Sequence, residues 1–420
     1  MGDRLDLHVV VVGRSVYALH GYGGLERHLY DLVRYHLYDR IRITLVTRPP
    51  DTPSGRDAER WSAVLHHPRF SLRYVPYRSL PFAGGRGTTI VDRSTSYPAF
   101  GRRAGREAAA IVATGDADVV YGVGASVVGY AAARRRGATA PLVMNPQGME
   151  EFGGADGSYG GWAMKGLGYL PLRRVVRTAA AGADAVIATD EAMAPVVRRH
   201  LPQTADRLRI IPNGLDVEDG DRLVDADASR QCRVRAGAEG GPLLVSVGRL
   251  EANKGFGDLI DALAILKTAV PWRWALVGEG PQRTSLESRL RAAGLGARVI
   301  LPGRVSDRAL HAWLGAADLF VHPTRYEGSS LVTLEAMLHR KPVVATRAGG
   351  LPDKVLPGRT GWLAPARAPD ALARVLEEAF SARDAWPSFG AAGRTLLERR
   401  FDWRVIQPQF RRLYEELLRR

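Results

Sequence analysis

Cysteine is nearly absent from this sequence: among 420 residues, Cys232 is the only one. A single thiol cannot form a disulfide within the chain, and it excludes the zinc sites that are built from several cysteines. Such low cysteine usage is typical of reducing compartments. We therefore expect a cytoplasmic protein.

Long hydrophobic runs are also missing. The apolar run near the N-terminus, Leu7–Val12, is too short for the apolar region of a secretion signal and ends at Gly13, as a buried strand would. The longest uncharged stretch, Val119–Ala133, is interrupted by glycines and falls short of the roughly 20 apolar residues that a membrane-spanning helix needs. We expect neither a secretion signal nor a transmembrane segment.

Acidic residues are outnumbered by basic ones, 44 against 59, which gives a formal net charge of +15. Nearly all the cations are arginine, a pattern that coding bias in a GC-rich genome explains as well as an anionic partner does. No nucleic-acid-binding module shows its signature here, so we expect no nucleic-acid partner. The rest of the composition, 45% hydrophobic and 25% charged, is that of a globular protein, and the length favours two domains.

Short β-branched runs alternate with helical patterns along the chain, in two series. This alternation predicts an α/β fold with parallel sheets and two Rossmann-like halves, and turn residues at 212–214 mark the expected seam. The expected strands are Leu7–Val12, Ile41–Thr47, Val119–Tyr121, Pro141–Met144 and Ala185–Ala188 in the first half, and Leu243–Val247, Trp274–Val277, Val299–Leu301, Leu319–His322 and Val343–Ala345 in the second.

The end of the chain carries apolar residues at helical spacing, which predicts a final helix with one apolar stripe. The stripe consists of Trp403, Ile406, Phe410, Leu413, Tyr414 and Leu417.

Two cations follow the strand expected at Leu243–Val247. Arg249 and Lys254 stand five residues apart on a loop that enters a helix. Ligands bind at the carboxyl ends of strands in open α/β sheets, and cations beside a helix N-terminus favour an anion there. Taken alone, the segment fits a solvated basic loop equally well, because it contains neither a P-loop nor a clean G-x-G-x-x-G pattern.

The segment Arg325–Ala336 is more informative. Glu327 lies on a loop, and Glu335 stands eight positions later inside the following helix, which Ser329 or Ser330 would cap. The free amides at that helix start favour phosphate oxygens, while the two carboxylates suit hydroxyls of a sugar or ribose. The pattern indicates a ligand that carries both phosphate and hydroxyl groups.

Six motifs, in this order, resemble those of the retaining family-4 glycosyltransferases, and together they cover nearly the whole chain. They are Gly-Gly-Leu-Glu-Arg at 23–27, Ile-Pro-Asn-Gly-Leu-Asp at 211–216, Val-Gly-Arg-Leu…Lys-Gly at 247–255, Val-Gly-Glu-Gly-Pro at 277–281, Glu-x7-Glu at 327–335 and Lys-Pro-Val-Val-Ala-Thr…Gly-Gly-Leu-Pro at 341–352.

The resemblance implies a GT-B fold, in which two Rossmann-like domains face a cleft and the last helix crosses back to the N-terminal domain. Residues 1–213 with the helix 402–420 would bind the acceptor, and residues 214–401 would bind the nucleotide sugar. The implied activity is retaining transfer of a hexosyl-type sugar from a UDP- or GDP-linked donor to a glycan or lipid-linked acceptor, in cell-envelope or exopolysaccharide synthesis.

The resemblance also implies roles for individual residues. By motif match, the catalytic candidates are Arg249 and Lys254, which would contact the donor pyrophosphate, and Glu327, close to the donor sugar and phosphate. Glu335 would hold the ribose hydroxyls. The other implied donor-binding positions are Gly23, Gly24, Gln147, Arg304, Val305, Ser329, Ser330 and Leu331.

Enzymes of this family are thought to transfer the sugar on one face, with the departing phosphate oxygen taking the acceptor proton. Fixed cations stabilise the leaving diphosphate, so the resemblance implies no metal and no other cofactor. The sequence agrees in lacking an Asp-x-Asp motif near the phosphate motifs.

The chain departs from the family pattern at Gln147, where many relatives have histidine. Glutamine can still form a hydrogen bond with a hydroxyl but carries no charge. This departure keeps open a catalytically inactive sugar-nucleotide-binding module, and a nucleotide-sugar epimerase of the same fold is a further alternative. Glu150 and Glu151 nearby are candidates to bind acceptor hydroxyls, but a role as ordinary charged loop residues explains them equally well.

Arginine clusters of the N-terminal half stand near the segment Trp162–Leu170, which also contains Met164, Leu167 and Tyr169. This combination suits an anionic membrane surface or a lipid-linked acceptor, and hence a peripheral position at the inner face of the membrane. Solvated helix faces explain the clusters slightly better. The arginines are Arg102, Arg103, Arg106, Arg134, Arg135, Arg136, Arg173, Arg174, Arg177, Arg198 and Arg199.

Overall fold

The computed structural model describes residues 6–17, 19–21, 23–50, 58–78, 88–153 and 167–420. The chain divides into two compact units: Met1–Asn213 with Ile406–Arg420, and Gly214–Val405. Each unit is built around one parallel sheet, which confirms the α/β class. Among the described residues, no helix is long and apolar enough to cross a membrane.

The first unit contains a seven-stranded sheet. Its strands are β1 (His8–Val12), β2 (Arg42–Thr47), β3 (Phe70–Tyr74), β4 (Val119–Val123), β5 (Leu142–Asn145), β6 (Ala185–Ala188) and β7 (Leu208–Ile210). They are parallel, in the order β3-β2-β1-β4-β5-β6-β7. Every residue of β1 is buried, as expected for a strand that helices cover on both faces.

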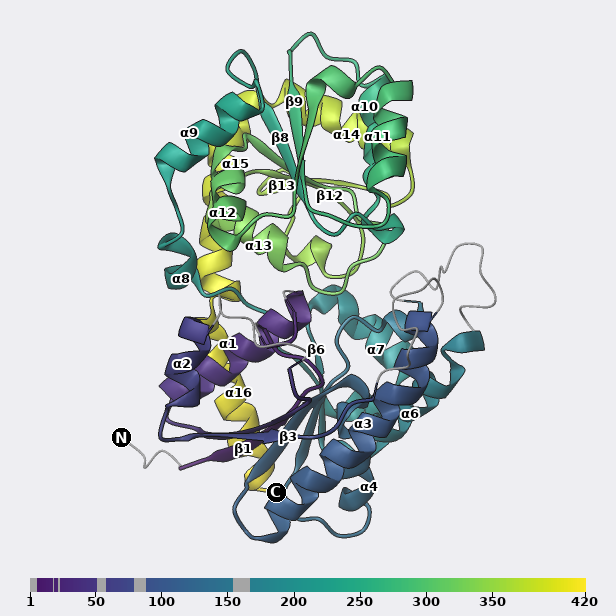
Figure 1. Cartoon of the computed structure of the whole chain (residues 1–420), viewed down its shortest axis with the longest axis vertical. Helices are drawn as coiled ribbons and strands as arrows, with labels where there is room; N and C mark the ends of the chain where they lie inside the picture. The colour runs from purple at the N-terminus through teal and green to yellow at the C-terminus, as the bar shows by residue number, and fades with distance from the viewer. Residues whose placement is uncertain (1–5, 18, 22, 51–57, 79–87, 154–166) are drawn as a thin grey trace. The chain divides into compact units, whose positions relative to one another are not determined.

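Helices flank both faces of this sheet. They are α1 (Gly24–Tyr38), α2 (Ala58–Leu65), α3 (Thr88–Ala113), α4 (Val128–Arg134), α6 (Leu170–Ala181), α7 (Ala194–His200) and α16 (Trp403–Leu418). In Figure 1, α1, α2 and α16 lie on one face, and α3, α4 and α6 lie on the other.

The second unit contains a six-stranded sheet. Its strands are β8 (Leu243–Val247), β9 (Arg273–Val277), β10 (Val299–Gly303), β11 (Leu319–His322), β12 (Val343–Thr346) and β13 (Gly361–Ala364). They are parallel, in the order β10-β9-β8-β11-β12-β13. The chain order reverses between β8 and β11, and at such switch points the following loops diverge and leave room for a ligand.

Helices also cover both faces of the second sheet. They are α8 (Val217–Asp221), α9 (Ala226–Arg235), α10 (Phe256–Ile265), α11 (Arg283–Ala292), α12 (Asp307–Ala316), α13 (Leu331–Leu338), α14 (Pro369–Ser381) and α15 (Trp386–Leu396). Figure 1 shows α10, α11 and α14 on one face, and α9, α12, α13 and α15 on the other. Each face encloses its own buried apolar cluster.

Within each sheet, aspartates link neighbouring strands at the N-terminal edge. Asp118, Asp184 and Asp318 immediately precede β4, β6 and β11, and each carboxylate accepts a backbone N–H from the first residue of the neighbouring strand. The donors are His8, Leu142 and Leu243, respectively, each at 2.7 Å. Each aspartate thereby satisfies an edge amide and fixes the register of the two strands.

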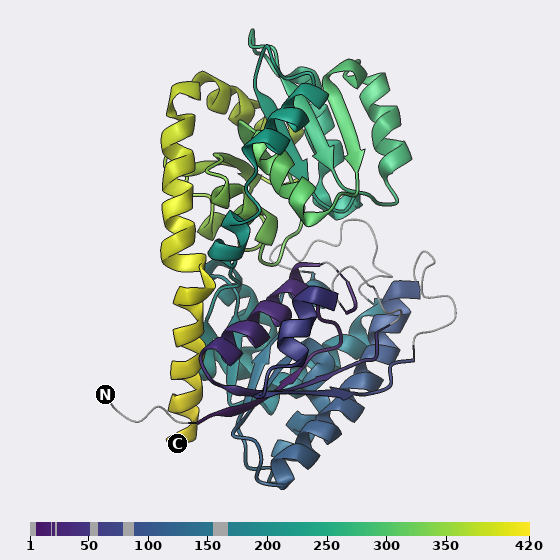
Figure 2. The same cartoon turned by 60° about the vertical axis from the view of Figure 1, so that its left-hand side comes forward.

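The final helix returns to the first unit, as the fold prediction requires. From Ile406 onward, α16 belongs to that unit, and Figure 2 shows it beside α1. The Tyr414 hydroxyl lies 2.9 Å from His36 Nε2, and Arg411 Nε donates to Asp39 Oδ2 at 2.5 Å. The whole predicted apolar stripe is buried.

All ten expected strands are present, with ends that differ by at most two residues. Three strands escaped the sequence analysis: β3, β7 and β13. The strands β3 and β7 are partly exposed edge strands, and β13 is a four-residue strand that begins with glycine. None of them shows the continuous buried run on which the prediction relied.

Candidate functional site

The loops that follow β8 and β11 meet at the switch point of the second sheet. The backbone N–H of Arg325 donates to the Asn253 carbonyl at 2.7 Å, and the Thr324 hydroxyl donates to the same carbonyl at 3.0 Å. Gly255 has φ +69°, and a Cβ there would stand 1.9 Å from the Pro323 carbonyl oxygen. Only glycine allows this close approach of the two loops.

This approach places Lys254 beside Glu327. The Lys254 ammonium donates to Glu327 Oε2 at 2.8 Å, and His322 Nε2 lies 3.1 Å from the same oxygen. Only 22%, 13% and 4% of the Lys254, Glu327 and His322 side chains are exposed, respectively. The three residues therefore form a mostly buried cluster, which we call the switch-point cluster.

The cluster fixes the charge of its members. Burial alone would raise the pKa of Glu327, but the Lys254 ammonium and the His322 N–H together hold that pKa well below its ordinary value. Burial lowers the pKa of His322, so the ring is neutral near pH 7. Because the carboxylate only accepts, His322 must carry its proton on Nε2, and Nδ1 is buried without a partner among the described residues.

His322 is a site residue that the sequence analysis missed. It occupies the last position of a buried strand, where a polar side chain is usually interpreted as a core residue whose hydrogen bonds are made within the protein. The detectable signal was its place at the carboxyl end of a switch-point strand, five residues before Glu327.

Arg249 shares the β8 loop with Lys254, but its side chain is 77% exposed and pairs with Glu251 at 2.8 Å. It therefore lies outside the switch-point cluster. Arg325, whose Nε donates to Asp258 Oδ2 at 2.7 Å, braces the β11 loop against α10.

The start of α13 lies next along the chain. Ser330, not Ser329, is its cap: the Ser330 hydroxyl accepts the Thr333 N–H at 3.3 Å. Ser329 instead accepts a hydrogen bond from Lys354 Nζ at 3.2 Å. Lys354 is fully buried, and its ammonium also lies 5.1 Å from the ring centre of Phe401. The start of α13 therefore has a buried cation beside it, Lys354, which the sequence analysis missed.

The remaining predicted donor residues of the second unit occupy the same sheet edge or α13. Leu331 is buried at the helix start, and Glu335 is half-buried on the next turn. Arg304 and Val305 directly follow β10, with Arg304 exposed and Val305 packed against the core.

Backbone from the β12 loop supports the Glu327 loop. Gly350 N–H donates to the Gly328 carbonyl at 2.8 Å. Gly349 has φ +51°, and a Cβ there would stand 1.7 Å from the Glu327 carbonyl oxygen, so glycine is again required.

In the first unit, Gly23 caps α1 and Gly24 begins it. Gln147 has φ +58° and donates its backbone N–H to Asn145 Oδ1 at 2.9 Å. Its side-chain carbonyl lies 3.5 Å from Asn213 Nδ2, while Nε2 is buried without a partner among the described residues. Gln147 is thus held in place while both N–H donors of its side-chain amide are unused among the described residues.

Glu150 and Glu151 differ in their surroundings. Glu150 pairs with Arg93 and remains partly exposed. Glu151 is buried, and burial raises its pKa despite nearby Arg93. Arg173 Nε donates to the Glu151 backbone carbonyl at 2.5 Å, so this arginine supports the loop that carries both glutamates.

The arginine clusters of the first unit are partly engaged in internal contacts. Arg134 pairs with Asp184 at 2.8 Å, and Arg177 Nε donates to the His200 carbonyl at 3.3 Å. Leu167, three residues before α6, and Leu170, its first residue, are 64% and 42% exposed, respectively. Trp162 and Met164 lie outside the described residues, so the predicted joint surface stays a prediction.

Comparison with known proteins gives two family matches. Residues 22–219 match Glycosyltransferase Family 4, and residues 241–381 match Glycosyl transferases group 1. A solved sucrose-phosphate synthase from Thermosynechococcus elongatus superposes with a TM-score of 0.76 at 22% identity, covering 98% of this chain and 99% of that one. The likeness confirms the GT-B fold.

Two curated proteins of Mycolicibacterium smegmatis are similar in sequence. A GDP-mannose-dependent alpha-(1-6)-phosphatidylinositol monomannoside mannosyltransferase is 30% identical over 264 residues, which cover 58% of this chain and 64% of that protein. An alpha-maltose-1-phosphate synthase is 30% identical over 274 residues, which cover 60% and 68%. The first alignment thus spans less than two thirds of the relative.

The pKa of Glu327 should depend on Lys254. In Lys254→Met, burial is no longer offset by the ammonium, so Glu327 should titrate at or above the ordinary value of 4.5. Carbon-detected NMR of the side-chain carboxyls measures this, with Lys267→Met, an exposed lysine of the same unit, as control. A Glu327 pKa still well below 4.5 in Lys254→Met would assign the effect to His322 instead.

Proposed function

The chain belongs to glycosyltransferase family 4, and on this basis we propose that it moves a hexosyl-type sugar from a UDP- or GDP-linked donor to a glycan or lipid-linked acceptor. The observation that carries the proposal is the switch-point cluster, which presents a buried cation at the edge of the sheet where ligands bind. One relative is a GDP-mannose-dependent mannosyltransferase, and this similarity supports a nucleotide-sugar donor.

In the proposed reaction, the bond between the anomeric carbon and a diphosphate oxygen breaks, and an acceptor oxygen bonds to that carbon on the same face. Negative charge develops on the departing diphosphate, where Lys254 and Arg249 would stabilise it. The acceptor proton passes to the departing phosphate oxygen. No separate protein base is needed, and the cations take the place of a metal or other cofactor.

The two glutamates have different proposed tasks. Glu327 holds Lys254 in one position through the 2.8 Å ion pair, and its ionised carboxylate can accept a hydrogen bond from a sugar hydroxyl. Glu335 would accept hydrogen bonds from the ribose hydroxyls. The backbone amides after Ser330, at the start of α13, would face phosphate oxygens.

His322 is proposed as a positioning residue. Its N–H occupies the second lone pair of Glu327 Oε2 and so fixes the rotamer in which that carboxylate meets Lys254. Since the ring is neutral, it restrains Glu327 without adding charge that would compete with Lys254.

For the acceptor, we propose a lipid-linked or glycan substrate of cell-envelope synthesis, reached from the cytoplasmic face of the membrane. The exposed side chains of Leu167 and Leu170 stand three residues apart, just before α6 and at its first residue, and exposed Arg174 follows Leu170 by one helical turn. Apolar side chains beside a cation suit an anionic lipid surface.

The first test separates donor binding from turnover. Lys254→Ala should lower kcat by about 10²–10³, the scale for one preorganised charge-stabilising group, and Arg249→Ala should do likewise. Glu335→Gln should chiefly weaken binding of the nucleotide in calorimetry, while Glu327→Gln should chiefly slow transfer. Lys267→Ala is the matched control. Normal turnover in both cation variants would refute the assignment.

The second test concerns the course of the reaction. The product linkage, assigned by NMR, should keep the anomeric configuration of an α-linked donor, and EDTA should leave the rate unchanged. An inverted linkage or a rate abolished by EDTA and restored by a divalent ion would contradict the proposed mechanism. An epimerised donor without transfer, or binding without any product, would favour the epimerase or the inactive module.

The third test concerns the acceptor surface. The protein should float with anionic vesicles and less with neutral ones, and added salt should weaken binding because charges are screened over about 10 Å at 0.1 M. Leu170→Ser with Arg174→Gln should weaken binding at least about fivefold, since one basic residue contributes about 1 kcal/mol. Arg291→Gln, in the second unit, is the control. Equal, negligible binding to both vesicle types would point to a soluble acceptor.

A further inference from the structure

A polar hollow lies at the opposite edge of the second sheet from the switch-point cluster, where β8, β11 and β12 begin. It has a volume of about 560 Å³ and adjoins another hollow of about 600 Å³. The two hollows share five lining residues: Arg233, Ala317, Asp318, Arg340 and Lys341. Small-molecule sites commonly have volumes of about 300–1,000 Å³. Because Asp318 precedes β11 and His322 ends it, this basal hollow and the switch-point cluster lie at opposite ends of one strand.

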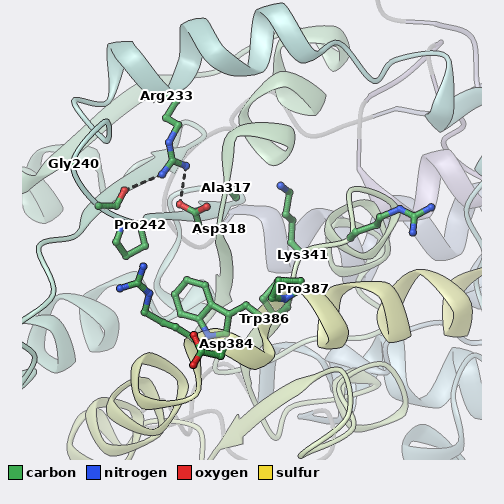
Figure 3. Close-up of a pocket in the computed structure, with 13 residues that line it drawn as sticks. Arg233, Gly240, Pro242, Ala317, Asp318, Lys341, Asp384, Trp386 and Pro387 are labelled. Carbon is green, nitrogen blue, oxygen red and sulfur yellow. Dashed lines mark hydrogen bonds and ion pairs between the residues drawn. The ribbon is translucent and has the colours of Figure 1, made fainter.

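One wall of the basal hollow is a fixed frame. Arg233, on α9, donates to Asp318 Oδ2 at 2.7 Å and to the Gly241 carbonyl at 2.9 Å. Figure 3 shows this pair on one side of the hollow and the Trp386 ring on the other. The Arg233 and Asp318 charges offset each other. The net charge of the hollow therefore comes from the other residues that line it.

That remaining lining is basic. It contains Arg340, Lys341 and Arg383, against the single carboxylate of Asp384. These cations come from two places far apart in the chain: the turn after α13 and the turn before α15. Four cations and two carboxylates therefore line the hollow, which gives it a net charge of +2.

Lys341 is the most constrained of these cations. Its ammonium has three donors, and among the described residues the Gly315 carbonyl, at 2.8 Å, is its one hydrogen-bond acceptor. Burial lowers the pKa of Lys341, the Asp318 carboxylate partly opposes this, and the Arg233 charge lowers the pKa further. A bound anion would stabilise the charged form of Lys341 and accept hydrogen bonds from its remaining N–H groups.

Arg340 stands where a helix end favours glycine. Its N–H donates to the Met337 carbonyl and that of Lys341 to the Ala336 carbonyl, the pattern of a Schellman turn. The turn requires positive φ, and Arg340 adopts φ +55°. The backbone alone would favour glycine here, so Arg340 presents its guanidinium from a position that is conformationally unfavourable for arginine.

We infer that the basal hollow binds a small phosphorylated compound that also carries hydroxyls. A phosphomonoester has a charge of about −1.5 to −2 at pH 7, which matches the net charge of the lining. Lys341, Arg340 and Arg383 supply donors for its oxygens, Asp384 can accept from hydroxyls, and the volume exceeds what phosphate alone would fill. The site is separate from the proposed donor site and does not depend on the proposed activity.

Calorimetry with D-glucose 6-phosphate, inorganic phosphate and neutral D-glucose tests the inference on the full chain. Either phosphate probe, but not D-glucose, should bind. Binding should weaken at least tenfold in Lys341→Gln with Arg383→Gln. Arg340→Gly, which suits the backbone, should be at least as stable thermally and should also bind more weakly.

Two control variants make the test specific. Lys254→Met alters the switch-point cluster, and Arg291→Gln removes an exposed cation on α11; both should bind the phosphate probe within twofold of the unaltered chain. The inference is overturned if no probe binds, if D-glucose binds equally, or if binding is lost in Lys254→Met but kept in the basal variants. An equal loss in Arg291→Gln would overturn it as well, by showing non-specific attraction to positive charge.

Discussion

The contact of Gly255 with the Pro323 carbonyl is the constraint on which the candidate site depends. Without a side chain at 255, the β8 loop can lie directly against the β11 loop, and Lys254 then reaches Glu327. The resulting ion pair is mostly buried, so removal of either partner would leave an uncompensated charge, at a cost of about 3–5 kcal/mol. The two loops are therefore coupled both by shape and by charge.

The sequence was sufficient for the architecture because its strands are buried on both faces. The sequences of β6, β8 and β11 are short runs in which apolar residues predominate, interrupted only by Ser246 and ended by His322, and their observed bounds match the prediction. The partly exposed β3 and β7 have no such run, and their place in the sheet comes from pairing with a neighbour.

The site was predictable only to the level of its motifs. Lys254, Glu327 and Glu335 could be named from spacing, but the ion pair joins residues 73 positions apart and follows from the loop contact. His322 and Lys354 were missed because a polar residue in a buried segment has no sequence pattern that reveals its partner. Arg249 pairs with Glu251 in this structure, and its predicted contact with the donor pyrophosphate stays a prediction.

The two edges of the second sheet are organised differently. At the N-terminal edge, Asp318 ties Arg233 and the first residue of β8 into a neutral frame with excess cations around it. At the carboxyl edge, the ion pair between Lys254 and Glu327 joins the loops that follow β8 and β11. Short strands connect the two edges, and apolar clusters pack against both faces of the sheet between them.

The most direct test of the central claim is a crystal structure of the chain with a bound nucleoside diphosphate. We predict diphosphate oxygens within hydrogen-bond distance of Lys254 Nζ and of the amides at the start of α13, with Glu335 at the ribose hydroxyls. A diphosphate bound elsewhere, with the Lys254–Glu327 pair unchanged and without contact to the ligand, would contradict it.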